Sequence, residues 1–101
     1  MPKAVGYYTN CTESHHLIHA FGDSLERLAA NDKLALITTL SLWLADDSNN
    51  LTIPDTAHWN EIPMSPNLAR AASIVEEIDP GDALSLIAAL TEQLRDGVYA
   101  R

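Results

Sequence analysis

The sequence predicts an all-α fold, a small bundle of four main helices built from two helix-corner-helix repeats. Leu25–Leu44 reads LERLAANDKLALITTLSLWL, and Val75–Leu94, fifty residues later, reads VEEIDPGDALSLIAALTEQL. Both stretches carry apolar residues at helical spacing, and no run of the chain shows convincing strand alternation. Neither unit can bury its apolar face alone, so we expect the two to pack together.

Length and charge restrict the class of protein. With 101 residues the chain is long enough for one helical domain, 1–101, with a single core. It is 47% hydrophobic and 20% charged, which is typical of a globular chain rather than a disordered one. The formal net charge is −8, and this predicts repulsion from phosphate backbones and anionic lipids. We therefore expect no nucleic-acid and no membrane partner, whereas a basic patch on another protein is compatible.

Cysteine usage and the N-terminal residues favour a cytoplasmic location. Cys11 is the single cysteine, so no internal disulfide can form, which suits a reducing compartment. The opening residues, MPKAVGYYTN, contain no apolar segment of the secretory type. The longest mostly apolar run, Leu34–Ala45, is too short to span a bilayer.

The first half of the chain is expected to hold an N-terminal arm, 1–12, and a first helix pair, 13–45. The first helix would be capped by Thr12 or Ser14 and would run to about Leu28. Its apolar stripe comprises Leu17, Ile18, Phe21, Leu25 and Leu28. The second helix would cover Ala30–Ala45, with apolar residues on more than one face, which is typical of a central helix.

The second half begins with a long central loop, 46–63, in which Pro54 and Pro63 are expected to prevent a regular helix. A second helix pair, 64–97, follows. Its first helix would open with Ser65 as N-cap and Pro66 in the first turn, and would carry a stripe ending near Ile78. Asp79-Pro80-Gly81-Asp82 is a restart signal, and the last helix would run from Pro80 to about Asp96, with Gly97 as a C-terminal cap.

A histidine cluster at the start of the first helix is the only metal candidate. His15 and His19 share a helix face and could bind zinc or nickel with a third ligand such as Cys11 or His58. Two histidines one turn apart are common, and the sequence has no cysteine pair and no HExxH motif. The pattern favours a solvated helix start, so we predict no metal site. His15, His19 and Cys11 are kept as weak candidates, with a metal-binding sensor as a further alternative function.

No catalytic residues are predicted, and we expect the protein not to be an enzyme and to have no cofactor. Paired carboxylates can act as acid and base when burial separates their pKa values. The acidic group Glu76, Glu77, Asp79 and Asp82 instead lies at a polar corner beside a helix cap, which favours capping and solvation. Cys11 has no convincing base beside it, and the glycines are scattered singly, so no phosphate loop is present.

Aromatic residues are the best candidates for binding, because tryptophan and tyrosine are enriched among interface hot spots. Trp43 lies on a leucine-rich helix, which favours the core, with ligand binding as the alternative. A groove between the helix pairs would be edged by Tyr7, Tyr8, Trp59, Ile62 and Met64. This predicts a non-enzymatic protein-binding adaptor or assembly factor that takes a peptide segment of another protein, and the repeat also permits a homodimer.

At LAANDKLALI and IDPGDALSLIAAL the chain resembles the N-terminal domain of the orange carotenoid protein family of cyanobacteria, over about residues 25–95. The resemblance implies an all-helical cyanobacterial scaffold linked to photosynthetic or carbon-fixation machinery. It also implies an alternative function, binding of a carotenoid or another apolar ligand. The family's aromatic pair of pigment contacts falls on Thr38 and Ser41 here, and Trp43 is displaced from it.

Overall fold

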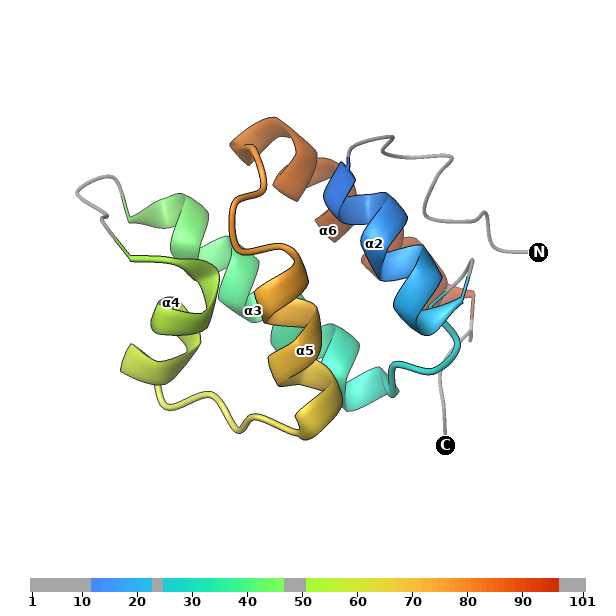
Figure 1. Ribbon diagram of the computed structural model, residues 1–101, viewed down its shortest axis with the longest axis horizontal. Coiled ribbons are helices and arrows are strands. Elements are labelled where there is room, and N and C mark those ends of the chain that lie inside the picture. Colours follow the sequence, from blue (N-terminus) through green and yellow to red (C-terminus); the bar gives the residue numbers. More distant parts are fainter. Residues whose placement is uncertain (1–11, 23–24, 47–50, 97–101) are drawn as a thin grey trace.

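The computed structural model describes residues 12–22, 25–46 and 51–96, and within these ranges the chain forms helices and no strand (Figure 1). The all-α class is therefore confirmed. The described helices are α2 (Thr12–Phe21), α3 (Ala30–Ala45), α4 (Ile53–Trp59), α5 (Pro66–Ile74) and α6 (Pro80–Arg95). The described part thus contains five helices rather than the four main helices expected. The arm with Tyr7, Tyr8 and Cys11, and the expected cap Gly97, lie outside the described residues.

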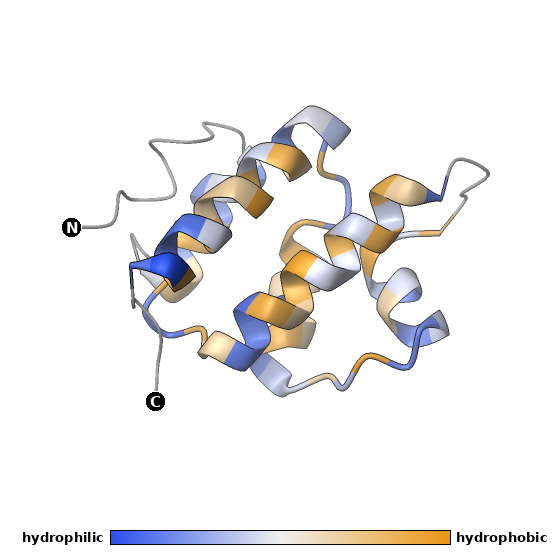
Figure 2. Cartoon of the chain, turned by 180° about the vertical axis from the view of Figure 1, so that it is seen from behind, coloured by the Kyte–Doolittle hydropathy of each residue, from blue (hydrophilic) through white to orange (hydrophobic). Residues whose placement is uncertain are grey.

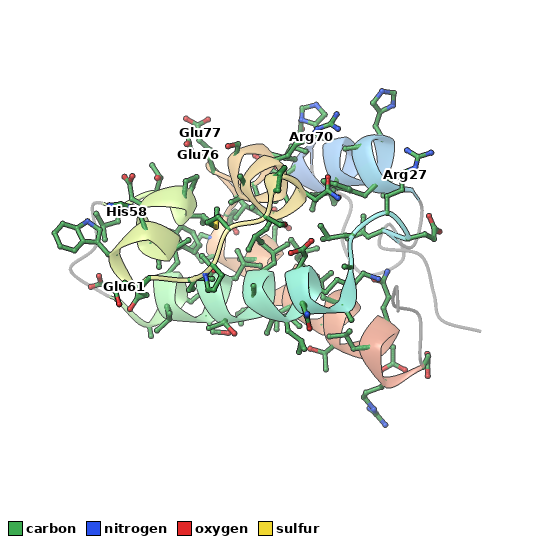
Figure 3. All side chains as sticks on the ribbon, turned by 90° about the horizontal axis from the view of Figure 1, so that it is seen from below. Arg27, His58, Glu61, Arg70, Glu76 and Glu77 are labelled. Carbon is green, nitrogen blue, oxygen red and sulfur yellow. The ribbon has the colours of Figure 1, made fainter. Side chains whose placement is uncertain are left out.

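The helices form two layers, with α2, α4 and α5 in one and α3 and α6 in the other (Figure 3). The central helix is α3, which packs against α4, α5 and α6, while α2 packs on α5. Fully buried apolar side chains from both layers fill the space between them, including Leu17, Phe21, Leu36, Leu40, Leu68, Leu86 and Leu90. This core leaves α4 at one end of the molecule, where it contacts α3 and α5.

The helices α3 and α6 lie where the sequence predicts them. Each has sixteen residues, and their first residues, Ala30 and Pro80, are fifty positions apart. Their burial follows the same order along the chain. Buried residues are Lys33, Leu36, Thr39 and Leu40 in α3, and Ala83, Leu86, Ala89, Leu90 and Gln93 in α6, so the first four of α6 lie fifty positions after those of α3.

A lysine inside the core was not expected from the sequence. Lys33 is fully buried in α3, at the position that alanine occupies in α6. Burial lowers the pKa of Lys33, and the negative charge of Glu26 partly opposes that shift. Seen from behind, α3 is mostly apolar along its length beyond the first turns (Figure 2). The charged residues of α3 are Asp32 and Lys33, both near its start, and Lys33 is buried.

The expectation that the first helix reaches about Leu28 is wrong, because α2 ends at Phe21. Gly22 follows with a φ of 98°, a left-handed conformation that glycine adopts without strain. Its N–H donates to the Ile18 carbonyl at 2.8 Å and closes the helix. Leu25 and Leu28 are fully buried, but they lie in the corner before α3. Ser14 is buried inside α2, so it is not the cap.

The central connection 46–63 is not free of helix, since Ile53–Trp59 forms α4. The expectation that Pro54 prevents a regular helix is wrong. Pro54 lies in the first turn of α4, where a backbone N–H would have no helical acceptor, so the missing donor does no harm. Pro63 lies beyond the C-terminal end of the helix.

The helix α5 begins as predicted but ends early. The Ser65 hydroxyl accepts a hydrogen bond from the Leu68 N–H at 3.0 Å, and Pro66 occupies the first turn. The helix then ends at Ile74 rather than near Ile78. The Ile78 N–H donates to the Val75 carbonyl at 3.0 Å, in the same way that Leu28 donates to Leu25 before α3. Both corners thus bury two apolar residues in a turn between helices.

We expect Ala29→Asp to raise the free energy of unfolding by about 0.5–2 kcal/mol. Ala29 is the N-cap of α3 and provides no side-chain hydrogen bond, with φ −63° and ψ 158°. Asp79, the N-cap of α6, has nearly the same backbone, φ −69° and ψ 143°, and its carboxylate accepts from the Gly81 N–H at 2.9 Å. Urea unfolding measures the change. Ala29→Ser, which caps without adding charge, should also stabilise, and no gain from either variant would contradict this reasoning.

Candidate partner-binding surface

The segment 53–64, which we call the α4 corner, is fixed at its N-terminal end by reciprocal capping. The Thr52 hydroxyl accepts a hydrogen bond from the Asp55 N–H at 3.2 Å, and the Asp55 carboxylate accepts from the Thr52 N–H at 3.5 Å. This capping box satisfies donors that the first turn of a helix leaves unpaired. Ile53, Thr56 and Ala57 face the core and are buried. The short helix is therefore held by its cap and by packing.

The C-terminal end of the α4 corner contains a residue in an unfavourable conformation. Glu61 has a φ of 55°, in the left-handed region that favours glycine. Its N–H donates to the His58 carbonyl at 3.2 Å, and the next N–H, of Ile62, donates to the Ala57 carbonyl at 3.0 Å. A residue with a Cβ in this region is strained by about 1–2 kcal/mol. In the described part of the chain, no hydrogen bond or ion pair holds the Glu61 side chain.

Two of the three described residues proposed for partner binding project into solvent. Trp59 is 72% exposed and Met64 is 40% exposed. Ile62 is half-buried and packs against the hydrophobic core, so it supports the corner more than it projects from it. The other two proposed residues, Tyr7 and Tyr8, lie outside the described residues. The α4 corner therefore presents an indole and a thioether on a fixed backbone.

The charge around the α4 corner has one sign. Between Lys33 and Arg70 the chain contains no lysine or arginine, while it contains the acids Asp46, Asp47, Asp55 and Glu61. Asp55 and Glu61 are both exposed. Figure 3 draws His58 and Glu61 at one end of the molecule and Arg27 and Arg70 toward the other. Arg70 lies over the Phe21 ring, 5.8 Å from its centroid, and is thus tied to the α2 end.

Trp43, the candidate for ligand binding, is anchored inside the protein. It is half-buried and packs against the core. Its indole N–H donates to the Leu51 carbonyl at 3.2 Å, which connects the end of α3 with the residue before the α4 cap. Such a partner is usual for a buried tryptophan. The geometry of Trp43 favours the core position that the sequence predicts.

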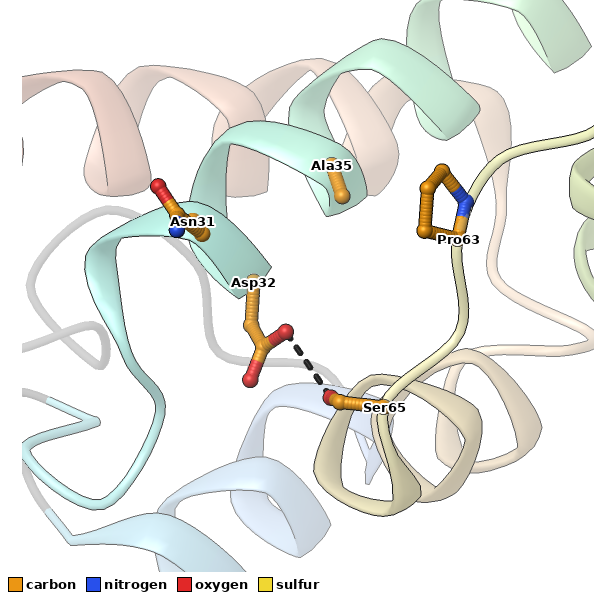
Figure 4. Close-up of a pocket in the computed structure, with 5 residues that line it drawn as sticks. All are labelled: Asn31, Asp32, Ala35, Pro63 and Ser65. Carbon is orange, nitrogen blue, oxygen red and sulfur yellow. Dashed lines mark hydrogen bonds between the residues drawn. The ribbon is translucent and has the colours of Figure 1, made fainter.

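A pocket of about 360 Å³ opens beside the N-terminal turns of α3. It is lined by Asn31, Asp32, Ala35, Pro63 and Ser65 (Figure 4). The Ser65 hydroxyl donates to the Asp32 carboxylate at 2.8 Å while it also caps α5, so one serine joins the starts of two helices. The pocket therefore holds a single carboxylate among small polar and apolar groups. That set contains no pair of groups suited to acid–base or nucleophilic catalysis.

The histidine and acidic groups are dispersed over the described surface. His15, His16 and His19 are exposed on α2. Of the two proposed third ligands, His58 is exposed on α4, and Cys11 lies outside the described residues. Among the residues that the structure describes, no group of three or more histidine, cysteine, aspartate or glutamate side chains is placed to hold a metal ion. Glu76 and Glu77 are exposed, and Asp79 caps α6.

Three further exposed leucines lie on the other layer. Leu34 and Leu42 of α3 and Leu84 of α6 have large exposed fractions, with Leu84 at 60%. The exposed residues here are all leucines, whereas the α4 corner exposes a tryptophan. No described helix has the length and apolar content that crossing a membrane requires.

The chain matches no protein-family model, no curated protein and no solved structure in the comparisons made with each. The resemblance to the orange carotenoid protein family therefore stays a hypothesis from the residues alone.

Proposed function

We propose that this chain is a non-enzymatic protein-binding adaptor or assembly factor that acts in the cytoplasm and holds a segment of its partner at the α4 corner. The observation that carries the proposal is the exposure of Trp59, 72% of whose surface is open to solvent. An exposed tryptophan keeps a large apolar surface in contact with water, and it can bury much area at small entropy cost when a partner covers it.

The rigidity of the α4 corner supports the proposal. The capping box at Thr52 and Asp55 and the buried Ile53 fix the helix that carries Trp59. A preorganised anchor loses little conformational entropy on binding, which favours affinity. The exposed Met64 lies a few residues further along and adds a flexible apolar contact that can adapt to a partner. Tyr7 and Tyr8 belong to the proposed surface as well.

The two units, 25–44 and 75–94, are part of the same proposal as copies of one helix-corner-helix repeat. Equal helix lengths and a common order of buried positions support this. The resemblance adds the hypothesis of a cyanobacterial scaffold linked to photosynthetic or carbon-fixation machinery. Carotenoid binding is the alternative, and its candidate contact, Trp43, packs against the core and donates its indole N–H to the Leu51 carbonyl. A homodimer through the exposed leucines of α3 and α6 is a further alternative.

Affinity capture tests the proposal with two variants, each of which replaces an exposed apolar residue with alanine. Tagged wild-type chain, Trp59→Ala and Leu84→Ala are incubated with lysate of the source organism, and retained proteins are quantified by mass spectrometry. We expect one dominant partner, retained by Leu84→Ala and reduced about tenfold or more by Trp59→Ala, as for a hot-spot residue. Both altered residues are exposed apolar side chains. A partner lost with Leu84→Ala and kept with Trp59→Ala would contradict the proposal and favour the α3 and α6 layer.

A further inference from the structure

We propose that the partner segment bound at the α4 corner is basic, with an arginine or lysine that lies over the Trp59 indole and pairs with Glu61 and Asp55. This inference rests on the proposed function and specifies the chemistry of the partner. It names a cationic peptide segment of another protein as the occupant, in preference to a neutral or acidic one.

Charge complementarity is the first argument. The exposed Trp59 is preceded by Asp55 and followed by Glu61, both exposed, in a stretch from 34 to 69 that contains no lysine or arginine. An acidic partner would be repelled by these carboxylates, whereas a basic partner would be attracted by both of them. Tryptophan is also the aromatic ring with the strongest attraction for a cation over its face. An exposed indole flanked by carboxylates thus suits a guanidinium or an ammonium group.

The conformation of Glu61 is the second, independent argument. A glycine would adopt a φ of 55° without strain, yet the position carries a glutamate whose side chain has no described hydrogen bond or ion pair. Among the described residues, the other one with a Cβ at positive φ is Leu25, which is fully buried, so packing in the core offsets its strain. At Glu61 the backbone is held by the hydrogen bonds of its own N–H and of the Ile62 N–H, but within the described residues no hydrogen bond or ion pair holds its carboxylate. Backbone outliers cluster at binding and switch sites, and an interaction with a cation supplies a reason to retain the carboxylate at this position.

Fluorescence anisotropy with synthetic peptides tests this inference on the full chain. The probes are three short labelled peptides that share their leucine and alanine positions and differ only in carrying arginine, glutamine or glutamate elsewhere. Each is titrated with wild-type protein, Glu61→Gln, Glu61→Gly, Trp59→Ala and the control Glu77→Gln. Glu77 is exposed on a different part of the surface, in the corner before α6, so its substitution removes the same charge elsewhere (Figure 3).

We expect the arginine peptide to bind best and its affinity to fall as salt is raised. Glu61→Gln and Glu61→Gly should each weaken it about two- to fivefold, and Trp59→Ala about tenfold or more, with Glu77→Gln unchanged. Glu61→Gly should at the same time raise the melting temperature by about 4 °C, because glycine relieves the strain. A variant that becomes more stable while it binds more weakly excludes misfolding as the cause of lost affinity.

Equal affinity for the three peptides, a preference for the glutamine or glutamate peptide, or no saturable binding of the arginine peptide would each overturn the inference. Equal losses from Glu61→Gln and Glu77→Gln would also overturn it, because they would indicate a general effect of net charge. None of these outcomes decides the proposed function, which is judged by the capture experiment with Trp59→Ala.

Discussion

Leu90→Ala is expected to lower the free energy of unfolding by about 2–5 kcal/mol, the largest effect on stability among the substitutions considered. Leu90 lies in α6 between the two layers and is fully buried. The substitution removes the stabilisation that comes from burying the deleted methyl and methylene groups. It also leaves a cavity that the surrounding helices can fill only in part. Domains of this size are stable by only about 5–15 kcal/mol, so the loss is a large part of the total.

The matched control is Leu84→Ala in the same helix. Leu84 is 60% exposed, and both leucine and alanine are good helix formers, so we expect a change within about 0.5 kcal/mol. Urea unfolding of the two variants and the wild type gives both values under one condition. Similar losses for Leu84→Ala and Leu90→Ala would contradict the two-layer packing described above.

Gln93→Met is expected to raise the free energy of unfolding by about 1–3 kcal/mol. Gln93 lies in α6 and is fully buried, and neither its amide nitrogen nor its amide oxygen has a hydrogen-bond partner in the described structure. Folding therefore removes this amide from water without compensation. Methionine has a side chain of similar length and volume, and its thioether carries no strong hydrogen-bond donor or acceptor that burial would leave unpaired.

The control for this substitution is Gln93→Glu, which keeps the shape and adds a charge at the buried position. We expect it to destabilise the protein, because an unpaired buried carboxylate is less favourable than an unpaired amide. Both variants can be followed by urea unfolding. A neutral or destabilising Gln93→Met would show that the amide is satisfied in solution, for example by a bound water molecule.

The helices α3 and α6 could be predicted from the sequence because several local signals agree there. Asp79, Pro80 and Asp82 mark the start of α6, and leucines recur at helical spacing behind them. The start of α5 at Ser65 is recognisable for the same reason. The ends of α2 and α5 were misplaced because the apolar spacing continues past them. Leu25 and Ile78 have the character of core residues and are buried, yet a turn rather than a helix carries them.

The helix α4 was missed although a signal for it is present. Thr52-Ile53-Pro54-Asp55 has the form of a capping box with proline in the first turn, but Pro54 was interpreted as a helix breaker. The exposure of Trp59 could be proposed from its place in the connection. Asp55 and Glu61 belong to no recognisable binding motif, although the absence of lysine and arginine from 34 to 69 is visible in the sequence.

Other features follow only from the three-dimensional structure. Lys33 and Gln93 are polar residues that sequence patterns place at the surface, and both are fully buried. Their positions depend on how α3 and α6 pack, which no local signal encodes. The left-handed conformation of Glu61 is also beyond local prediction, since glutamate has no preference for it.

The most direct test of the central claim compares stability and partner affinity in a single variant, Trp59→Ala. The account predicts a free energy of unfolding within about 0.5 kcal/mol of wild type, because an exposed side chain contributes little to the core. It predicts an affinity for the captured partner that is weaker by about tenfold or more. A variant that loses stability and helicity in step with affinity would show that Trp59 belongs to the core of the folded protein, and the α4 corner would no longer stand as the binding surface.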